Sequence, residues 1–140
     1  MKKHLNAVAI GALLGLAFVG GHTLTFEGWA QDKAPDINIG TFSMPRDDWE
    51  FLLDPLMEEM RRFDFNGRRL DVRENVAFQG KGEQTRFVHE LYPGKGCAIA
   101  LEFKKFFMDE WSGEPDAAEL TAMRAFVSHI AAAATDLLRR

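Results

Sequence analysis

The chain has 140 residues, of which 46% are hydrophobic and 27% are charged, a length that suits one ordinary globular domain and is too short for two. Its 17 basic and 21 acidic residues give a formal net charge of −4, so nucleic acid or anionic lipid would have to be held by a local patch. Cys97 is the one cysteine, so no intramolecular disulfide can form and stability must come from the packed core.

The first thirty residues have the pattern of a bacterial export signal. Lys2 and Lys3 precede a stretch from Leu5 to Phe26 that contains no Asp, Glu, Lys or Arg, which is the order found in secretory signal peptides. We expect cleavage after Ala30, with Gly21 as a second candidate position. The remainder of the chain is then predicted to be periplasmic or secreted.

The same apolar stretch permits a second interpretation. Its 22 residues without a formal charge are enough to cross a bilayer core, which needs about 17–25 residues. The sequence therefore also allows an uncleaved inner-membrane anchor that holds the following domain outside the cytoplasm.

Residues 31–43 are predicted to be a polar tail that turns into a short edge strand. Ile37, Ile39 and Phe42 alternate with polar or small residues there, which is typical of a strand with one buried face. We expect residues 44–140 to form a single α+β domain.

The first element of that domain is predicted to be a helix from Pro45 to Phe63. Its apolar residues recur at three- and four-residue steps. They are Trp49, Leu52, Leu53, Leu56, Met60 and Phe63. Because Pro55 lacks a backbone N–H, we expect a kink or break at that position.

Three strands are predicted next, within residues 70–79, 85–92 and 97–103. The first and third alternate apolar and polar residues, and the buried face of the third is predicted to carry Cys97, Ile99, Leu101 and Phe103. Short glycine-rich links at 80–82 and 93–96 cannot carry a parallel crossover, so we expect an antiparallel meander.

The last segment is predicted to be a long helix that begins after Asp116 and runs almost to the C-terminus. Asp116 is a suitable N-cap, and an apolar stripe follows at helical spacing. The stripe consists of Leu120, Met123, Val127, Ile130, Ala134 and Leu137. The predicted architecture is a two-layer α+β fold with both helices on one face of a three-stranded sheet.

Catalytic and metal-binding motifs are weak in this sequence. His89 and Glu90 match the start of a zinc-protease helix signature, but the second histidine is replaced by Pro93. No metal and no cofactor are predicted. Cys97 with His89 or His129 is the one arrangement that suggests a thiol enzyme or small hydrolase, because such pairs are assembled by the fold.

Aromatic residues give the leading candidate for a binding site. Phe106, Phe107 and Trp111 lie between the last strand and the last helix, and large aromatic side chains are enriched in interface anchors. Together with Trp49 they are predicted to line a groove for a protein or a small amphipathic ligand.

Arginines near the end of the first helix give a second candidate. Arg68 and Arg69 belong to the main cationic concentration of the chain, and guanidinium groups bind carboxylate or phosphate through paired hydrogen bonds. They are predicted as an anion site, with internal salt bridges as the competing interpretation.

These observations favour an exported, non-catalytic domain that binds a protein or a small amphipathic ligand. The alternatives are a small secreted hydrolase or thiol enzyme that uses Cys97, and a membrane-tethered subunit of an envelope assembly. No nucleic-acid partner is predicted.

Overall fold

The computed structural model describes residues 34–109 and 111–140, so the predicted export segment at residues 1–30 lies outside the described part. The elements are β1 (Ile37–Gly40), the 3-10 helix η2 (Arg46–Trp49), α1 (Glu50–Arg62), β2 (Val72–Glu74), α2 (Glu83–Leu91), β3 (Ala100–Phe103) and α3 (Ala117–Leu138). The α+β class is confirmed. None of the helices in the described ranges is long and apolar enough to span a membrane.

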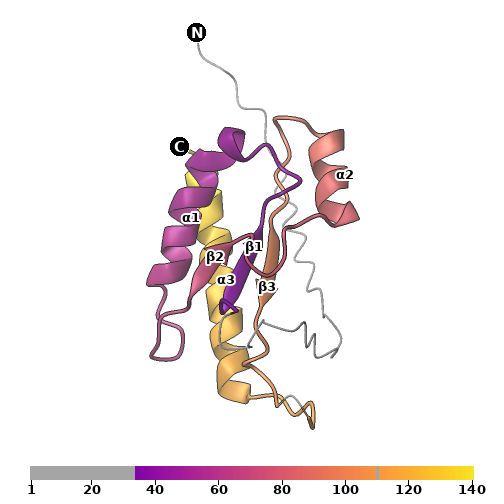
Figure 1. Ribbon diagram of the computed structural model, residues 1–140. Coiled ribbons are helices and arrows are strands. Elements are labelled where there is room, and N and C mark those ends of the chain that lie inside the picture. The colour runs from indigo at the N-terminus through magenta and orange to yellow at the C-terminus, as the bar shows by residue number, and fades with distance from the viewer. Residues whose placement is uncertain (1–33, 110) are drawn as a thin grey trace.

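The three strands form one mixed sheet in the order β2-β1-β3. β1 is parallel to β2, with Ile37 opposite Val72, and antiparallel to β3, with Asn38 opposite Glu102. The predicted antiparallel meander is therefore wrong, and the segment predicted as an edge strand is the central one. The link from β1 to β2 contains α1, and a helical crossover of this length is what parallel pairing requires (Figure 1).

All four residues of β1 are buried, including Asn38. The amide of Asn38 donates to the carbonyl oxygen of Phe78 at 2.8 Å and accepts from the N–H groups of Val76 and Ala77 at 3.0 Å each. The segment after β2 thus crosses the sheet face opposite the long helices. A polar side chain with hydrogen-bond partners can occupy a central strand. The alternation of Ile37 and Ile39 with Asn38 predicts an edge strand only on the assumption that Asn38 faces water.

The second predicted strand, residues 85–92, is instead helix α2. The Thr85 hydroxyl donates to the carbonyl oxygens of Gly80 and Gly82 at 2.9 Å each and so fixes the start of the helix. α2 buries Thr85 and His89 while it exposes Phe87 and Leu91. Its apolar residues Phe87, Val88 and Leu91 keep helical spacing, but the helix has only nine residues, and so short an apolar run does not distinguish a helix from a strand.

The helix predicted from Pro45 to Phe63 is present as η2 followed by α1. α1 runs from Glu50 to Arg62 without ending at Pro55. The N–H that proline lacks would have bonded to the carbonyl of Phe51. Phe51 lies on the exposed side of the helix, so water can satisfy that carbonyl.

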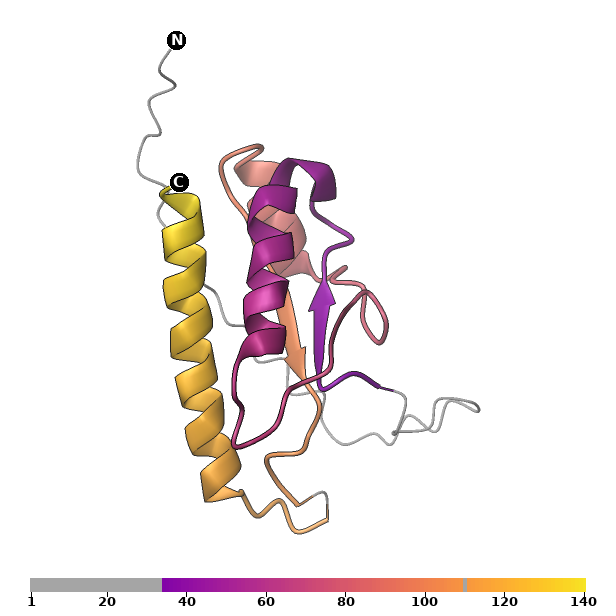
Figure 2. The same ribbon diagram turned by 90° about the vertical axis from the view of Figure 1, so that its left-hand side faces the viewer.

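The core lies between the sheet and the pair formed by α1 and α3, which run side by side in opposite directions (Figure 2). Phe126 of α3 is fully buried at its centre, with the rings of Phe63 and Phe103 edge-on at 5.4 and 5.7 Å. Met123 and Ile130 are buried beside it, as predicted. Asp116 caps α3 by accepting from the N–H groups of Ala118 and Glu119.

Candidate functional site

Trp111 is the most exposed large hydrophobic residue among those described, with 91% of its surface accessible. It lies on a loop between β3 and α3, which Met108 and Pro115 close by a bridge across its base. One carboxylate accepts from the backbone N–H of Trp111 and from the backbone N–H and hydroxyl of Ser112.

That carboxylate belongs to Asp109. Its Oδ1 accepts from the N–H of Trp111 at 3.0 Å, from the N–H of Ser112 at 2.7 Å and from the Ser112 hydroxyl at 2.9 Å. These bonds, led by that from the Ser112 N–H, lower the pKa of Asp109. Gly113 completes the turn with a φ of 73°, a left-handed conformation that glycine adopts without strain.

The other aromatic residues of the predicted groove do not gather around Trp111. Phe107 is buried in the main core, and its carbonyl accepts from the N–H of Asp116 at the start of α3. Trp49 is buried in a second cluster, which packs against Leu137 and Leu138 at the far end of the same helix. The 22 residues of α3 span about 33 Å, so these two aromatics occupy opposite ends of the molecule and line no common groove.

Phe106 is tied to the arginine of the predicted anion site. The guanidinium of Arg68 lies 5.1 Å from the Phe65 ring centroid and 5.0 Å from that of Phe106. Both of its Nη atoms donate to Glu119, at 2.7 and 2.5 Å. Arg68 is therefore already occupied by an internal carboxylate, which agrees with the competing interpretation made from the sequence. Arg69, its neighbour, is exposed.

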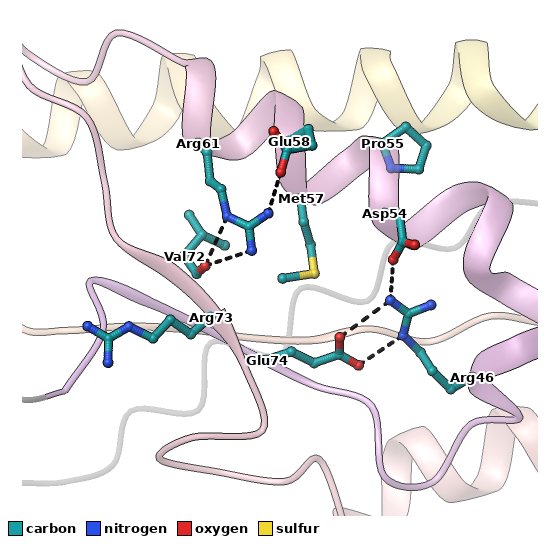
Figure 3. A pocket seen from close by; sticks show the side chains of 9 residues that line it. All are labelled: Arg46, Asp54, Pro55, Met57, Glu58, Arg61, Val72, Arg73 and Glu74. Atoms are coloured by element: carbon teal, nitrogen blue, oxygen red, sulfur yellow. Dashed lines mark hydrogen bonds and ion pairs between the residues drawn. The ribbon is translucent and has the colours of Figure 1, made fainter.

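A polar hollow of about 570 Å³ lies beside β2 and α1 (Figure 3). Arg46 donates from Nε to Glu74 at 3.0 Å and from Nη2 to Asp54. Arg61 donates to the carbonyl of Val72 and to Glu58. The cations and anions that line the hollow thus neutralise one another. They form a structural network rather than a prepared site for a charged ligand.

His89 has the geometry of a structural histidine. Its Nε2 accepts from the N–H of Ala98 at 3.0 Å, so the neutral ring carries its proton on Nδ1, which lies 3.3 Å from the Ser43 hydroxyl. Burial lowers the pKa of His89 and favours this neutral form. A ring with that tautomer cannot take a proton from Ser43, because the facing nitrogen is already protonated.

The remaining candidates for catalysis are not activated. Burial raises the pKa of the Cys97 thiol to about 11, so it stays protonated at neutral pH and is a poor nucleophile. His129 belongs to α3 and lies 3.3 Å from Glu59 of α1. Within residues 34–109 and 111–140, no three His, Cys, Asp or Glu side chains converge as metal ligands would.

Glu102 on β3 is a further candidate that no sequence motif indicates. Its Oε2 is buried, and no hydrogen-bond partner is found for it among the described residues. Burial raises the pKa of this carboxyl to about 7. Alternation correctly places Glu102 on the face opposite Leu101 and Phe103, but only the strand order shows that it lies on an edge strand.

The fold defines a small α+β domain with a three-stranded mixed sheet. No family model matches the sequence, and no curated protein matches it. Among solved structures, the chain is similar to the crystal structure of N-formylglutamate amidohydrolase from Ralstonia eutropha, with 16% identity and a TM-score of 0.51. The match covers 76% of this chain and 35% of that one. At this identity the similarity concerns the fold alone.

Proposed function

We propose that the protein is an exported, non-catalytic domain that binds a protein or a small amphipathic ligand through Trp111. The observation that carries the proposal is the 91% exposure of this indole on a loop that Asp109 holds in place. Tryptophan is enriched at the energetic centres of interfaces. The hydrogen bonds from the N–H groups of Trp111 and Ser112 to Asp109 fix that part of the backbone, which reduces the conformational entropy lost when a partner binds.

The charge around Trp111 indicates which surface it would meet. Asp109, Glu114 and Asp116 lie within five residues of it in the sequence, and no basic residue lies between Phe106 and Arg124. A partner with an apolar pocket and a basic rim would complement this loop.

A hydrolytic function is the alternative, and the structural neighbour is itself an amidohydrolase. The described residues give it little support, because the Cys97 thiol is protonated and His89 is held by Ala98. We therefore favour binding over catalysis.

Export is the second part of the proposal, and it rests on the apolar stretch after Lys2 and Lys3. The mass of the protein recovered from the cell envelope tests it. Loss of residues 1–30 or 1–21 supports a cleaved signal peptide. An intact chain in the membrane fraction supports the tethered alternative, and an intact chain in the cytosol contradicts export.

The binding experiment uses a photo-crosslinking residue at position 111, with a matched probe at Phe51, an aromatic residue that is 57% exposed on α1. We expect a discrete crosslinked species from position 111 and none from position 51. The same partner should bind Trp111→Ala at least about tenfold more weakly, as expected for an interface anchor, and bind Phe51→Ala normally. Equal binding of both variants would exclude Trp111 as the contact.

A further inference from the structure

The outer edge of β3 is the starting observation. Lys104 N–H donates to the carbonyl of Asp36 at 2.9 Å, and Asn38 lies opposite Glu102. The even-numbered residues of this strand therefore direct their backbone groups to β1. It follows from the alternation of an antiparallel ladder that Leu101 and Phe103 direct theirs away from the sheet.

No described residue forms a backbone hydrogen bond with this outer side of β3. The opposite edge of the sheet, formed by β2, has a side chain bonded to its backbone. There the guanidinium of Arg61 donates from Nε and Nη2 to the carbonyl of Val72, at 3.2 and 3.0 Å. An edge that is not covered is a template for pairing with another strand.

Side-chain charge on β3 limits which strand can pair with it. Glu102 and Lys104 lie two residues apart and share the face opposite α3, and the Oε2 atom of Glu102 is buried without a hydrogen-bond partner among the described residues. An unpaired buried carboxylate oxygen is costly. A cation on the incoming strand, directly opposite Glu102, would remove that cost.

A second copy of the chain provides such a strand in one register only. The register depends on which residue the two-fold axis passes through. With the axis at Leu101, Glu102 lies opposite Ala100 of the partner subunit, and with the axis at Glu102 it lies opposite Glu102 of the partner subunit. Only the axis at Phe103 places Glu102 opposite a cation, Lys104 of the partner subunit, and the symmetry then forms this pair twice. Registers shifted by one residue would turn each side chain to the wrong face.

We propose that the protein forms a two-fold symmetric dimer in which the β3 edges of two copies pair antiparallel about Phe103. Glu102 and Lys104 of the partner subunit then occupy a non-hydrogen-bonded position, where cross-strand side chains are closest. The two sheets become one continuous sheet. α2 does not obstruct this arrangement, because the His89 bond to Ala98 holds it at the other end of β3 (Figure 1).

The overlap is short, so the dimer is expected to be weak and concentration-dependent. Sedimentation equilibrium on the purified protein, at concentrations up to about 100 µM, should show a reversible monomer–dimer equilibrium. A protein that stays monomeric over this range would overturn the proposal.

Charge reversal tests the register. Glu102→Lys brings two lysine pairs together and Lys104→Glu brings two glutamate pairs together, so each single variant should dimerise roughly tenfold more weakly. The double variant Glu102→Lys/Lys104→Glu restores opposite charges and should return to within about threefold of the original affinity. Lys95→Glu makes the same change of charge at an exposed position in the turn after α2, away from the pairing, and is the matched control that should change the affinity little.

Circular dichroism and thermal melts check that each variant folds. Recovery in the double variant is assigned to the pairing when the single variants melt as the unmodified protein does, because Glu102 and Lys104 are also neighbours on one face of their own strand. A double variant as weak as the singles would exclude the Phe103 register. Neither outcome depends on Trp111, so the dimer and the proposed function are tested separately.

Discussion

Arg68 shows how the structure uses a side chain that the sequence leaves open for a ligand. Its guanidinium is packed beside two phenylalanine rings and bonded to both oxygens of Glu119. A planar, bidentate contact of this kind suits arginine and not lysine. The pair ties the turn after α1 to the first turn of α3.

Removing that arginine should destabilise the fold. The side chain of Glu119 is only 12% exposed. In Arg68→Ala its carboxylate keeps Asn66 as its remaining side-chain donor. Because Arg68 itself is partly solvated, we expect a loss of about 2 kcal/mol in the free energy of unfolding. Urea denaturation measures it. Arg69→Ala, at the exposed neighbouring position, is the control and should stay within about 0.5 kcal/mol.

The effect of Arg68→Ala should also depend on pH. The hydrogen bond from Arg68 lowers the pKa of Glu119, so the folded state favours the ionised carboxylate. This contribution is present above the ordinary pKa of glutamate and is lost as the pH falls through the lowered value. The gap between the two proteins should therefore narrow below about pH 4. A constant gap would mean that ring packing, and not charge, dominates.

At the scale of elements, the sequence predicts best where one face of a long segment is apolar. α1 and α3 were predicted because residues such as Leu56 and Ile130 recur at helical spacing, and β3 because Leu101 and Phe103 alternate with Glu102. α2 is not predicted because its apolar residues, Phe87, Val88 and Leu91, form a run that is too short to distinguish a helix from a strand.

The order of the strands could not be predicted for a different reason. It depends on the contact between β1 and the segment after β2, which are about forty residues apart. Nothing local to Asn38 shows that Val76, Ala77 and Phe78 will satisfy its amide.

The closest backbone approach in this contact gives a test of the fold. A Cβ added at Gly40 would lie 2.5 Å from the backbone nitrogen of Gly80 and 2.6 Å from its Cα. Gly40→Ala should therefore push the segment after β2 off the sheet and cost about 2–3 kcal/mol of stability. Gly82→Ala, where nothing lies within 4 Å of the added atom, should cost no more than about 1 kcal/mol. Similar losses for both variants in urea denaturation would contradict the close approach.

At the scale of the whole molecule, the candidate site was predictable only in part. Trp111 was named from its place between a strand and a helix, and it is exposed. Phe107 is predicted on the same grounds, and Trp49 of the first predicted helix is added to the same groove, but the chain buries these two at opposite ends of α3. Composition identifies which side chains make good anchors, whereas exposure depends on the packing of distant elements. Glu102 was not predicted as a site residue, because only the strand order shows that it lies on an edge strand.

The dimer should strengthen as the pH rises through neutrality. In the single subunit, burial raises the pKa of Glu102 to about 7, with Asn38 of β1 and Lys104 of its own strand as the polar neighbours on that face. Pairing with Lys104 of the partner subunit favours the ionised carboxylate, so each subunit releases a proton when the dimer forms. The dissociation constant should then fall between about pH 6 and pH 8, by about tenfold for each carboxylate that must ionise.

Glu102→Gln separates this effect from other changes with pH. Glutamine keeps the shape of the side chain and cannot ionise, so the variant should dimerise weakly and with little dependence on pH over the same range. Sedimentation equilibrium at several pH values measures both proteins. The titration of Glu102 predicts that the dissociation constant falls with rising pH and that this dependence disappears in Glu102→Gln. A dissociation constant that rises with pH in the unmodified protein would show that another group governs association. The same pH dependence in Glu102→Gln would show it too.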